Sequence, residues 1–367
     1  MRIGRPPSLD PKEPRETGVA LVIVLLTLFV LGAMAAMFAY SMKIESRLAI
    51  NTGNATELEW LGRSGIEYAK WILVQQDRVP SERGFNSLNQ FWAGGPGPLE
   101  SADNPFEGLS LKDIPVGEGR ISVRIEDTER LLNINTVARN PVLLDQALVY
   151  VGGDSTDATI ISSALQDWID RDDFAQPGNG AESEYYLGLI PPYRAKNGPV
   201  DDVRELLLLR GMKPELFWGS QYRITSLGAD GFKEAVGMNS NSAKTGQGLV
   251  SLFCALSNGK VNINTASPKV IALILGGDDS LAGEVLKIRS GPDGMDATED
   301  DQPARNAGEI PRLLGPAGPS AQGLFVVQSM TFSVTVRAEL GSAKQTFTGL
   351  IRRVGPRDYQ NLYFRQE

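Results

Sequence analysis

Acidic side chains that could bind a cation are concentrated in residues 164–211. Six of these carboxylates lie close together in sequence: Asp167, Asp170, Asp172, Asp173, Glu182 and Glu184. Arg171 is the one basic residue among them, so the carboxylates repel one another unless a cation binds. Oxygen ligands on a flexible loop suit Ca²⁺, which takes roughly six to eight of them, although the spacing differs from that of an EF-hand. The segment therefore indicates either a calcium site or a solvated acidic loop.

Several residue types that enzymes commonly use are absent or rare. The chain has no histidine and one cysteine, Cys254. This composition excludes Ser/His and Cys/His nucleophile pairs, an internal disulfide and a zinc–thiolate cluster. Paired carboxylates hydrolyse glycosides in other proteins. The nearby aromatic residues are more typical of a core than of a sugar-binding surface; they are Trp168, Tyr185, Tyr186 and Tyr193. We predict that the protein is not an enzyme.

The acidic segment lies between two copies of an Asn-Ile-Asn-Thr motif, at residues 133–136 and 262–265. An apolar stretch, Gly-Gly-Asp and a second helical stretch follow each copy. We expect the threonine that ends each motif to cap the first helix, and Asp154 and Asp278 to lie near the start of the second. A third related unit, residues 199–212, places an aspartate pair before a helix and a glycine after it.

These units resemble helix-hairpin-helix modules, in which backbone amides hold a DNA phosphate. The resemblance makes a membrane-anchored DNA-binding protein an alternative function. Asp154, Asp278 and Asp279 would repel a phosphate at the place where amides should attract it. The net charge of −8 at pH 7 also argues against a nucleic-acid surface. We therefore do not expect nucleic acid as a partner.

An uncharged apolar run, residues 19–40, precedes all of these motifs. As a helix, its residues span ~33 Å at ~1.5 Å each, enough to cross a bilayer core of ~30 Å. Four basic residues precede the run and predict a leader, residues 1–18, on the cytoplasmic side of the inner membrane. They are Arg2, Arg5, Lys12 and Arg15. The bulk of the chain would then lie in the periplasm.

The helical pattern continues past the membrane, because residues 43–76 carry apolar residues at three- and four-residue steps. A polar leader that ends in Gly18, followed by such a helix, resembles the type IV pilin family. In that family a prepilin peptidase cuts after the glycine, here before Val19. The family's glutamate at the fifth mature position is replaced by Ile23, which indicates a subunit with no neighbour above it. A secretory signal cut after Ala35 and an uncleaved anchor are the alternatives.

Strand patterns flank the helical segment. Residues 121–129 alternate apolar and polar side chains, as do residues 324–340 and 344–355, which read as a hairpin. A third region, residues 77–119, is rich in turns and should hold short strands in a long irregular connection. We predict a sheet whose strands are separated in sequence by an insertion.

Three acidic and polar motifs, together with the Asn-Ile-Asn-Thr segments, resemble the minor pseudopilins of type II secretion systems. They are Asp-Trp-Ile-Asp-Arg-Asp-Asp at 167–173, Gly-Ala-Glu-Ser-Glu-Tyr-Tyr at 180–186, and the run from Pro191 to Gly211. The resemblance implies an α+β fold class: a pilin-like long N-terminal helix packed on a small antiparallel sheet, with a large inserted all-α, helix-hairpin-helix-like domain.

The resemblance and the patterns together divide the 367 residues into six segments. We expect a cleaved leader (1–18), a transmembrane helix (19–42), the first part of a pilin-like domain (43–130), an inserted α-helical domain with the acidic segment (131–260), a second helix-hairpin-helix-like unit with an acidic loop (261–324), and C-terminal strands that complete the sheet (325–367).

The resemblance further implies a place at the tip of a periplasmic pseudopilus. There the protein would help initiate pseudopilus assembly and the export of folded proteins across the outer membrane. Partners would be two other minor pseudopilins, I and J, the prepilin peptidase and the inner membrane, with secreted proteins as a further class. Family members bind calcium near the acidic segment, which by motif match points to Asp170, Asp172, Glu182 and Glu184. A minor pilin of a type IV pilus is the related alternative.

Overall fold

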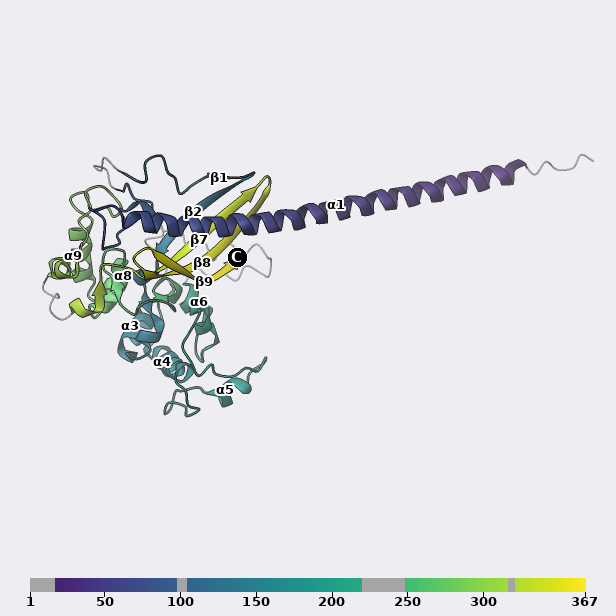
Figure 1. The fold of residues 1–367 in the computed structure, drawn as a ribbon. Coiled ribbons are helices and arrows are strands. Elements are labelled where there is room, and N and C mark those ends of the chain that lie inside the picture. The colour runs from purple at the N-terminus through teal and green to yellow at the C-terminus, as the bar shows by residue number, and fades with distance from the viewer. Residues whose placement is uncertain (1–16, 98–103, 220–247, 316–320) are drawn as a thin grey trace, which may run out of the picture. The chain divides into compact units, whose positions relative to one another are not determined.

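The computed structural model describes residues 17–97, 104–219, 248–315 and 321–367 (Figure 1). The chain forms two units, Met1–Glu59 and Trp60–Glu367. A single helix, α1, extends from Thr17 to Gln76 and contributes to both. The predicted continuation of the helix beyond the apolar run, as far as residue 76, is therefore confirmed.

In the first unit, α1 has the length and composition of a membrane-spanning helix. Its segment Val19–Ser46 contains 28 residues with a mean hydropathy of 2.8, and within the described residues it is the one segment of this kind. The apolar side chains along it are exposed, Phe29 by 76% and Met37 by 77%. A lipid or protein surface is needed to cover them. The basic residues of the predicted leader lie outside the described residues.

The second unit contains a five-stranded sheet in the order β1-β2-β7-β8-β9, with every neighbouring pair antiparallel. The strands are β1 (Ile114–Val116), β2 (Gly119–Asp127), β7 (Thr331–Leu340), β8 (Ala343–Gly355) and β9 (Asp358–Gln366). The strand predicted at 121–129 corresponds to β2, whose residues alternate between buried and partly or fully exposed. The predicted hairpin corresponds to β7 and β8, and Gly341 turns the chain between them at a φ of 57°.

The C-terminal strand β9 lies in the segment 325–367, where C-terminal strands were expected, but no separate strand was predicted beyond residue 355. Leu362, Tyr363 and Phe364 are adjacent, so the sequence lacks the alternation of a half-buried strand. The pairing of β9 with β8 also shifts register between Leu350 and Ile351, which breaks the two-residue period. An edge strand with such an irregularity is stabilised by its neighbour and leaves little signal in its own sequence.

The C-terminal part of α1 lies across the sheet (Figure 1). Its buried residues in the second unit follow the spacing of one helix face: Leu61, Ile66, Ala69, Ile72 and Leu73. Two glycines on this face permit close approach. A Cβ at Gly62 would lie 2.5 Å from the ring of Phe347, and one at Gly65 would lie 2.4 Å from Cγ1 of Val336.

Between β2 and β7 the chain is mostly helical. The α-helices are α2 (Ile134–Val137), α3 (Pro141–Tyr150), α4 (Ser155–Ile169), α5 (Ser183–Leu187), α6 (Pro214–Trp218), α8 (Pro268–Ile274), α9 (Asp279–Arg289) and α10 (Ile310–Leu314). Short 3-10 helices are η1 (Phe91–Ala93), η2 (Thr128–Arg130), η3 (Val203–Leu208), η4 (Leu249–Ser251), η5 (Ala307–Glu309) and η7 (Gln322–Leu324). One continuous cluster of buried apolar side chains joins this region, with members from Phe85 to Val327. The division of the helical region at residue 260 stays a prediction.

The first residue of each Asn-Ile-Asn-Thr motif ends a two-residue strand, and each of these strands belongs to a parallel pair. The sequence did not predict this feature. β3 (Leu132–Asn133) pairs with β4 (Phe253–Cys254), and β5 (Val261–Asn262) pairs with β6 (Phe325–Val326). The partner of each short strand lies far along the chain, so no local pattern reports the pairing.

The helix caps differ in part from the prediction. Asn140 and Ser267, not Thr136 and Thr265, occupy the N-cap positions of α3 and α8. Each threonine lies too far before its helix, and the hydroxyl of Thr265 donates instead to Asp127 Oδ2 at 2.6 Å.

The acidic caps of the second helices are confirmed. The carboxylate of Asp154 accepts from the Asp157 amide at the start of α4, and that of Asp278 accepts from two amides at the start of α9. In the third unit, Asp202 and Glu205 form a capping box, but the helix that they begin, η3, is a 3-10 helix.

Candidate functional site

The acidic segment begins at the C-terminal end of α4. Trp168 holds this end in place, because it is buried and packs edge-on against Tyr186, with ring centroids 5.4 Å apart. Tyr193 stacks on the other face of this group, with its ring 5.1 Å from that of Tyr186. Tyr185 is 40% exposed and Tyr193 is partly buried, so the predicted core position is confirmed only for Trp168 and Tyr186. They bring the loop after α4 and the start of α5 together.

Asp167 anchors the loop that follows α4. Its side chain is fully buried and accepts hydrogen bonds from the amides of Gln176, at 3.1 and 3.2 Å, and Ala181, at 2.6 Å. Gly180 is required at its position, because a Cβ there would lie 2.2 Å from Asp167 Oδ2. The loop therefore folds back on the helix and places Glu182 over the end of α4.

Three carboxylates converge at this point. Asp167, Asp170 and Glu182 each offer one oxygen, and the three oxygens lie within 4.8 Å of one another. Oδ1 of Asp170 and both carboxylate oxygens of Glu182 are buried without a hydrogen-bond partner among the described residues. Buried acceptors without partners cost free energy. A divalent cation would supply the missing partner to all three oxygens.

The electrostatics of the cluster agree with this geometry. Burial, followed by the charges of Asp167, Asp170 and Asp173, raises the pKa of Glu182 to about 7. Burial and the neighbouring charges of Asp172 and Asp167 also raise the pKa of Asp170. Like charges disfavour ionisation in both cases. A bound cation would reverse the effect and favour the ionised carboxylates.

Of the four calcium ligands that the resemblance implies, the structure brings two together and leaves two apart. Asp170 and Glu182 belong to the converging group, whereas Asp172 and Glu184 are exposed outside it. Asp172 Oδ1 accepts from the Phe174 amide at 3.0 Å, and Glu184 lies in the first turn of α5. Asp167 joins the group although the prediction of ligands omitted it. Its position in the last turn of α4, three residues before Asp170 at the C-cap, was the signal that could have found it.

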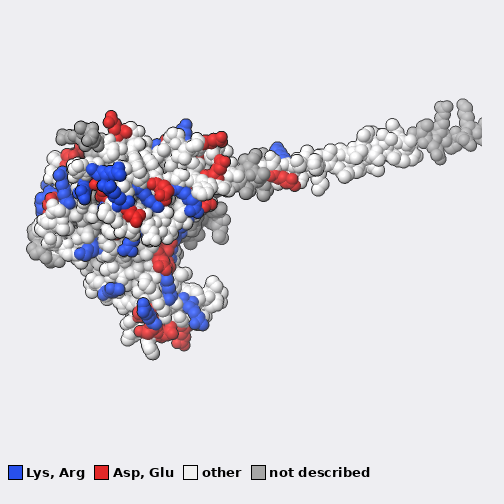
Figure 2. Space-filling view, viewed as in Figure 1, with Lys and Arg blue, Asp and Glu red and all other residues white. Residues whose placement is uncertain are grey.

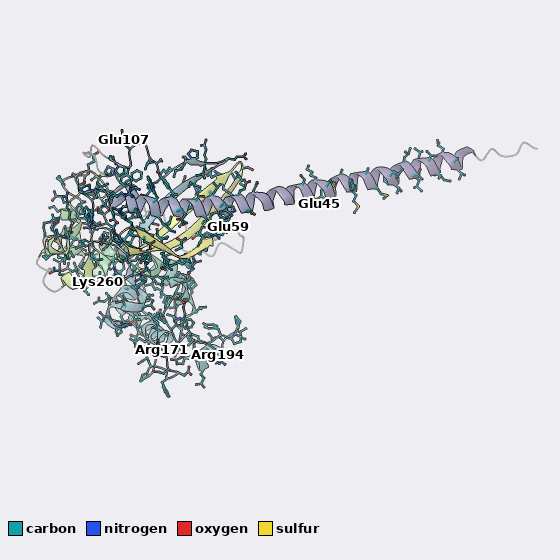
Figure 3. The ribbon with its side chains drawn as sticks, viewed as in Figure 1. Glu45, Glu59, Glu107, Arg171, Arg194 and Lys260 are labelled. Atoms are coloured by element: carbon teal, nitrogen blue, oxygen red, sulfur yellow. The ribbon has the colours of Figure 1, made fainter. Side chains whose placement is uncertain are left out.

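Charged side chains surround the site. Figure 2 shows acidic side chains gathered at the end of the molecule that carries α4 and α5 in Figure 1, with basic side chains beside them. Arg171 and Arg194 lie at this end (Figure 3), and both are exposed. Neither Arg171 nor Arg194 forms an ion pair with a described residue, and the buried oxygens of Asp170 and Glu182 have no hydrogen-bond partner there either.

The predicted cleavage position lies at the start of α1. The helix begins at Thr17 and continues without interruption through Gly18 and Val19. Ile23, at the position of the absent glutamate, is 55% exposed. The cleavage itself stays a prediction.

A second acidic cluster, which sequence reasoning missed, lies where β2 meets the helical region. Asp127 and Glu129 are both buried. Oδ2 of Asp127 accepts from the side chains of Asn262, Thr265 and Ser329 at 3.0, 2.6 and 2.6 Å. Oε1 and Oε2 of Glu129 accept from backbone amides of residues 258 and 331. These acceptors are satisfied, so the cluster ties segments together and leaves no oxygen for a ligand.

Comparisons with known proteins agree with the motifs. Residues 131–219 match the family model of the type II secretion system (T2SS), protein K. The type II secretion system protein K of Aeromonas hydrophila is 24% identical over 91% of this chain and 92% of its own length. The protein of that name from Klebsiella pneumoniae is 27% identical over 71% of this chain and 69% of its own length. That of Pseudomonas aeruginosa is 23% identical over 92% of this chain and 89% of its own length.

A solved structure shares the fold. The match is to a chain of the crystal structure of the GspK-GspI-GspJ complex from the enterotoxigenic Escherichia coli type 2 secretion system. It has a TM-score of 0.61 at 18% identity and covers 86% of this chain and 98% of that one. The mixed fold, with an N-terminal apolar helix and an antiparallel sheet, is confirmed. The recognition made from the acidic motifs is confirmed as well: over nearly its whole length this chain is similar to type II secretion system protein K.

Proposed function

We propose that this chain is a minor pseudopilin of a type II secretion system, at the tip of the pseudopilus. The observation that carries the proposal is the similarity to protein K, which extends over 91% of the chain in the Aeromonas hydrophila protein. The related Escherichia coli chain was solved in a GspK-GspI-GspJ complex. By analogy, pseudopilins I and J are the partners of this chain.

The arrangement of helix and sheet supports a pilin-like domain. The C-terminal part of α1 packs on the antiparallel sheet through Gly62 and Gly65, and the sheet is interrupted between β2 and β7 by the helical region. The exposed apolar segment Val19–Ser46 is available both to lipid and to the helices of sister subunits. In this proposal the helix leaves the inner membrane, packs against those helices, and carries the helical region into the periplasm.

Ile23 supports the place at the tip. A carboxylate within an apolar helix is costly unless it is paired, and α1 carries none between Val19 and Tyr40. A subunit without this carboxylate does not pair with a neighbour above it. The prepilin peptidase would cut between Gly18 and Val19 and produce the mature helix.

The mass of the mature N-terminus tests the processing step. The full chain is expressed with its prepilin peptidase, isolated from membranes in detergent and analysed by mass spectrometry. We expect a start at Val19, with or without N-methylation, and an intact chain when Gly18 is replaced by a bulky residue, Gly18→Leu. An intact Met1 in the wild type, or a start after Ala35, would contradict the proposal.

We also propose that the acidic segment binds calcium. The donors fit, because two of the three converging carboxylates hold buried oxygens without partners, and carboxylate oxygens are the ligands that calcium prefers. Asp167, Asp170 and Glu182 would hold the ion together with water. When bound, calcium would neutralise the mutual repulsion of these groups and fix the loop between α4 and α5.

Thermal unfolding of the full chain in detergent tests the calcium proposal. A ligand that binds only the folded state stabilises it by about 2.7 kcal/mol at 100 times its Kd. We expect millimolar calcium to raise the melting temperature of the wild type and of Glu184→Gln, whose side chain is exposed. Glu182→Gln should lose most of this rise. An equal rise of the melting temperature in Glu182→Gln, or no rise in the wild type, would contradict the proposed calcium site.

The helix N-termini favour this role over DNA binding. Asp154 and Asp278 place carboxylates on the first amides of α4 and α9, the groups that would otherwise hold a phosphate. The proposed role is therefore that of an assembly protein and not that of a DNA receptor.

A further inference from the structure

The structure contains a basic cavity that the pseudopilin function does not use. It has a volume of about 570 Å³, within the range of small-molecule sites. Three separate parts of the chain form it: the turn after α1, the connection between β6 and β7, and the turn between β8 and β9. Its lining residues are Asp77, Arg78, Pro80, Arg83, Gly84, Gln328, Arg353, Pro356 and Arg357.

The charges of this cavity are strongly unequal. Four arginines and one aspartate line it, which leaves a surplus of three positive charges. Figure 2 shows basic side chains gathered over the place where α1 ends in Figure 1. Like charges held together repel, and a cavity with low-dielectric walls concentrates their field. An anion inside the cavity would remove this cost.

One arginine is fixed in the cavity by the protein. Arg353 is 12% exposed, and its guanidinium forms an ion pair with Asp77 and donates to the Pro356 carbonyl at 3.3 Å. Burial raises the pKa of Asp77, and the charges of Arg353, Arg83 and Arg357 act against that rise. These arginines therefore surround Asp77. The single negative charge of Asp77 compensates the positive charge of one arginine and leaves the others in excess.

The remaining arginines are free to bind a ligand. Arg78 donates only to a neutral group, Oε1 of Gln75, at 3.2 Å. Arg83 and Arg357 are exposed and have no hydrogen bond or ion pair with any described residue. Guanidinium groups bind phosphate oxygens in pairs of parallel hydrogen bonds, so two free arginines on opposite turns of one cavity suit a ligand with neighbouring phosphate groups.

We propose that this cavity is a binding site for a diphosphate group. Arg83 and Arg357 hold its oxygens, while Arg78 and Gln328 contact it from the sides. A diphosphate carries about three negative charges near pH 7, and these balance the surplus positive charge of the cavity. The group belongs either to a free molecule or to a phospholipid headgroup, since the chemistry recognised is the same.

Isothermal titration of the full chain in nonionic detergent with inorganic pyrophosphate tests the site. We expect saturable binding that weakens as salt rises. The double variant Arg83→Ala/Arg357→Ala should weaken binding at least tenfold. Both side chains lack partners in the described residues, so the variant should keep the wild-type melting temperature. Arg352→Ala is the matched control, because Arg352 is exposed on β8 next to Arg353 but outside the cavity, and it should bind as the wild type does.

Competition with a soluble short-chain diacylglycerol diphosphate, a lipid that carries the diphosphate group itself, identifies the source of the group. Displacement of pyrophosphate shows that the site admits a lipid headgroup, and failure to displace it shows a site for free diphosphates. Both results require the arginines. Absence of saturable pyrophosphate binding, or equal affinity in the double variant and the wild type, would overturn the proposal.

Discussion

At the scale of single residues, Glu182 is a group whose protonation depends strongly on the fold. Its side chain is 5% exposed and its pKa is about 7, above the ordinary value of 4.5. The folded chain without a cation therefore binds this proton more tightly than the unfolded chain does. Stability from this group is fully present below about pH 4.5 and is lost as the pH rises through about 7.

This linkage predicts the pH dependence of the calcium-free protein. In the presence of a chelator, the melting temperature should fall between about pH 4.5 and pH 7. Glu182→Gln should reduce the fall, because the amide does not ionise, whereas Glu184→Gln should leave it unchanged. Melting curves at several pH values measure the effect. A fall of the same size in Glu182→Gln would show that Glu182 does not titrate in this range.

The second acidic residue of consequence is Asp127, which joins segments far apart in the sequence. Replacement by alanine removes the acceptor of three side-chain donors and of the Glu129 amide. Each buried donor left unpaired costs about 1–3 kcal/mol, so Asp127→Ala should lower the free energy of unfolding by roughly 3 kcal/mol or more. Urea unfolding of the full chain in detergent measures this loss.

The neighbouring residue Glu126 supplies the control. Its carboxylate pairs with Arg124 and Arg130 at 2.9 and 3.3 Å on a partly exposed surface. Such pairs contribute about 0–1 kcal/mol, so Glu126→Gln should change stability little. Equal losses of unfolding free energy in the two variants would mean that the buried network around Asp127 contributes no more to stability than an exposed ion pair does.

The residues that form these clusters were visible in the sequence to different degrees. The acidic segment stands out by composition, and the resemblance pointed to Asp170 and Glu182 within it by motif match. The pair at Asp127 and Glu129 reads only as the end of a strand. Its partners lie about 130 to 200 residues further along the chain, a distance over which no local pattern is informative.

At the scale of elements, the glycines of α1 have a packing role that helix propensity alone does not show. From the sequence, Gly53, Gly62 and Gly65 read as local weak points of a helix. In the structure, the hydrogen atoms of Gly62 and Gly65 face Phe347 and Val336, whereas Gly53 has open space around it. The same residue type thus has opposite consequences at different positions on one helix.

This difference predicts opposite effects for the same substitution. Gly65→Ala would place a methyl group 2.4 Å from Val336 Cγ1, and Val336 is buried and stiff. Overpacking costs about 1–3 kcal/mol, which exceeds the gain in helix propensity of up to about 1 kcal/mol. Gly65→Ala should therefore destabilise the protein in urea unfolding, whereas Gly53→Ala should stabilise it or leave it unchanged. Stabilisation by both would show that α1 does not pack closely on the sheet.

The elements themselves were partly predictable. The strands β2, β7 and β8 were predicted from the alternation of apolar and polar residues in their sequences. Burial follows this alternation in β2 and in most of β7, whereas residues 347–351 of β8 are all buried. The strands β3 to β6 and β9 were not predicted individually, because two-residue strands and an irregular edge strand depend on partners from elsewhere in the chain. The capping positions of α4 and α9 were predicted, since an aspartate beside a glycine turn is a local signal.

At the scale of the whole molecule, the exposed apolar part of α1 is the feature that requires other molecules. Val19–Ser46 has no buried residue within the structure, so lipid or sister helices must cover it. The sequence predicted the anchor and the resemblance predicted the partners. What the sequence could not predict is the single apolar core that extends through the helical region, because that core combines side chains from segments separated by more than 200 residues.

The central claim is that this chain is one subunit of a pseudopilus tip. Native mass spectrometry of the full chain, co-expressed with its prepilin peptidase and with pseudopilins I and J of the same secretion system and purified in detergent, tests it most directly. We predict a complex that contains one copy of each protein, with this chain processed to begin at Val19. A chain that is recovered alone and unprocessed, while I and J assemble without it, would contradict the account.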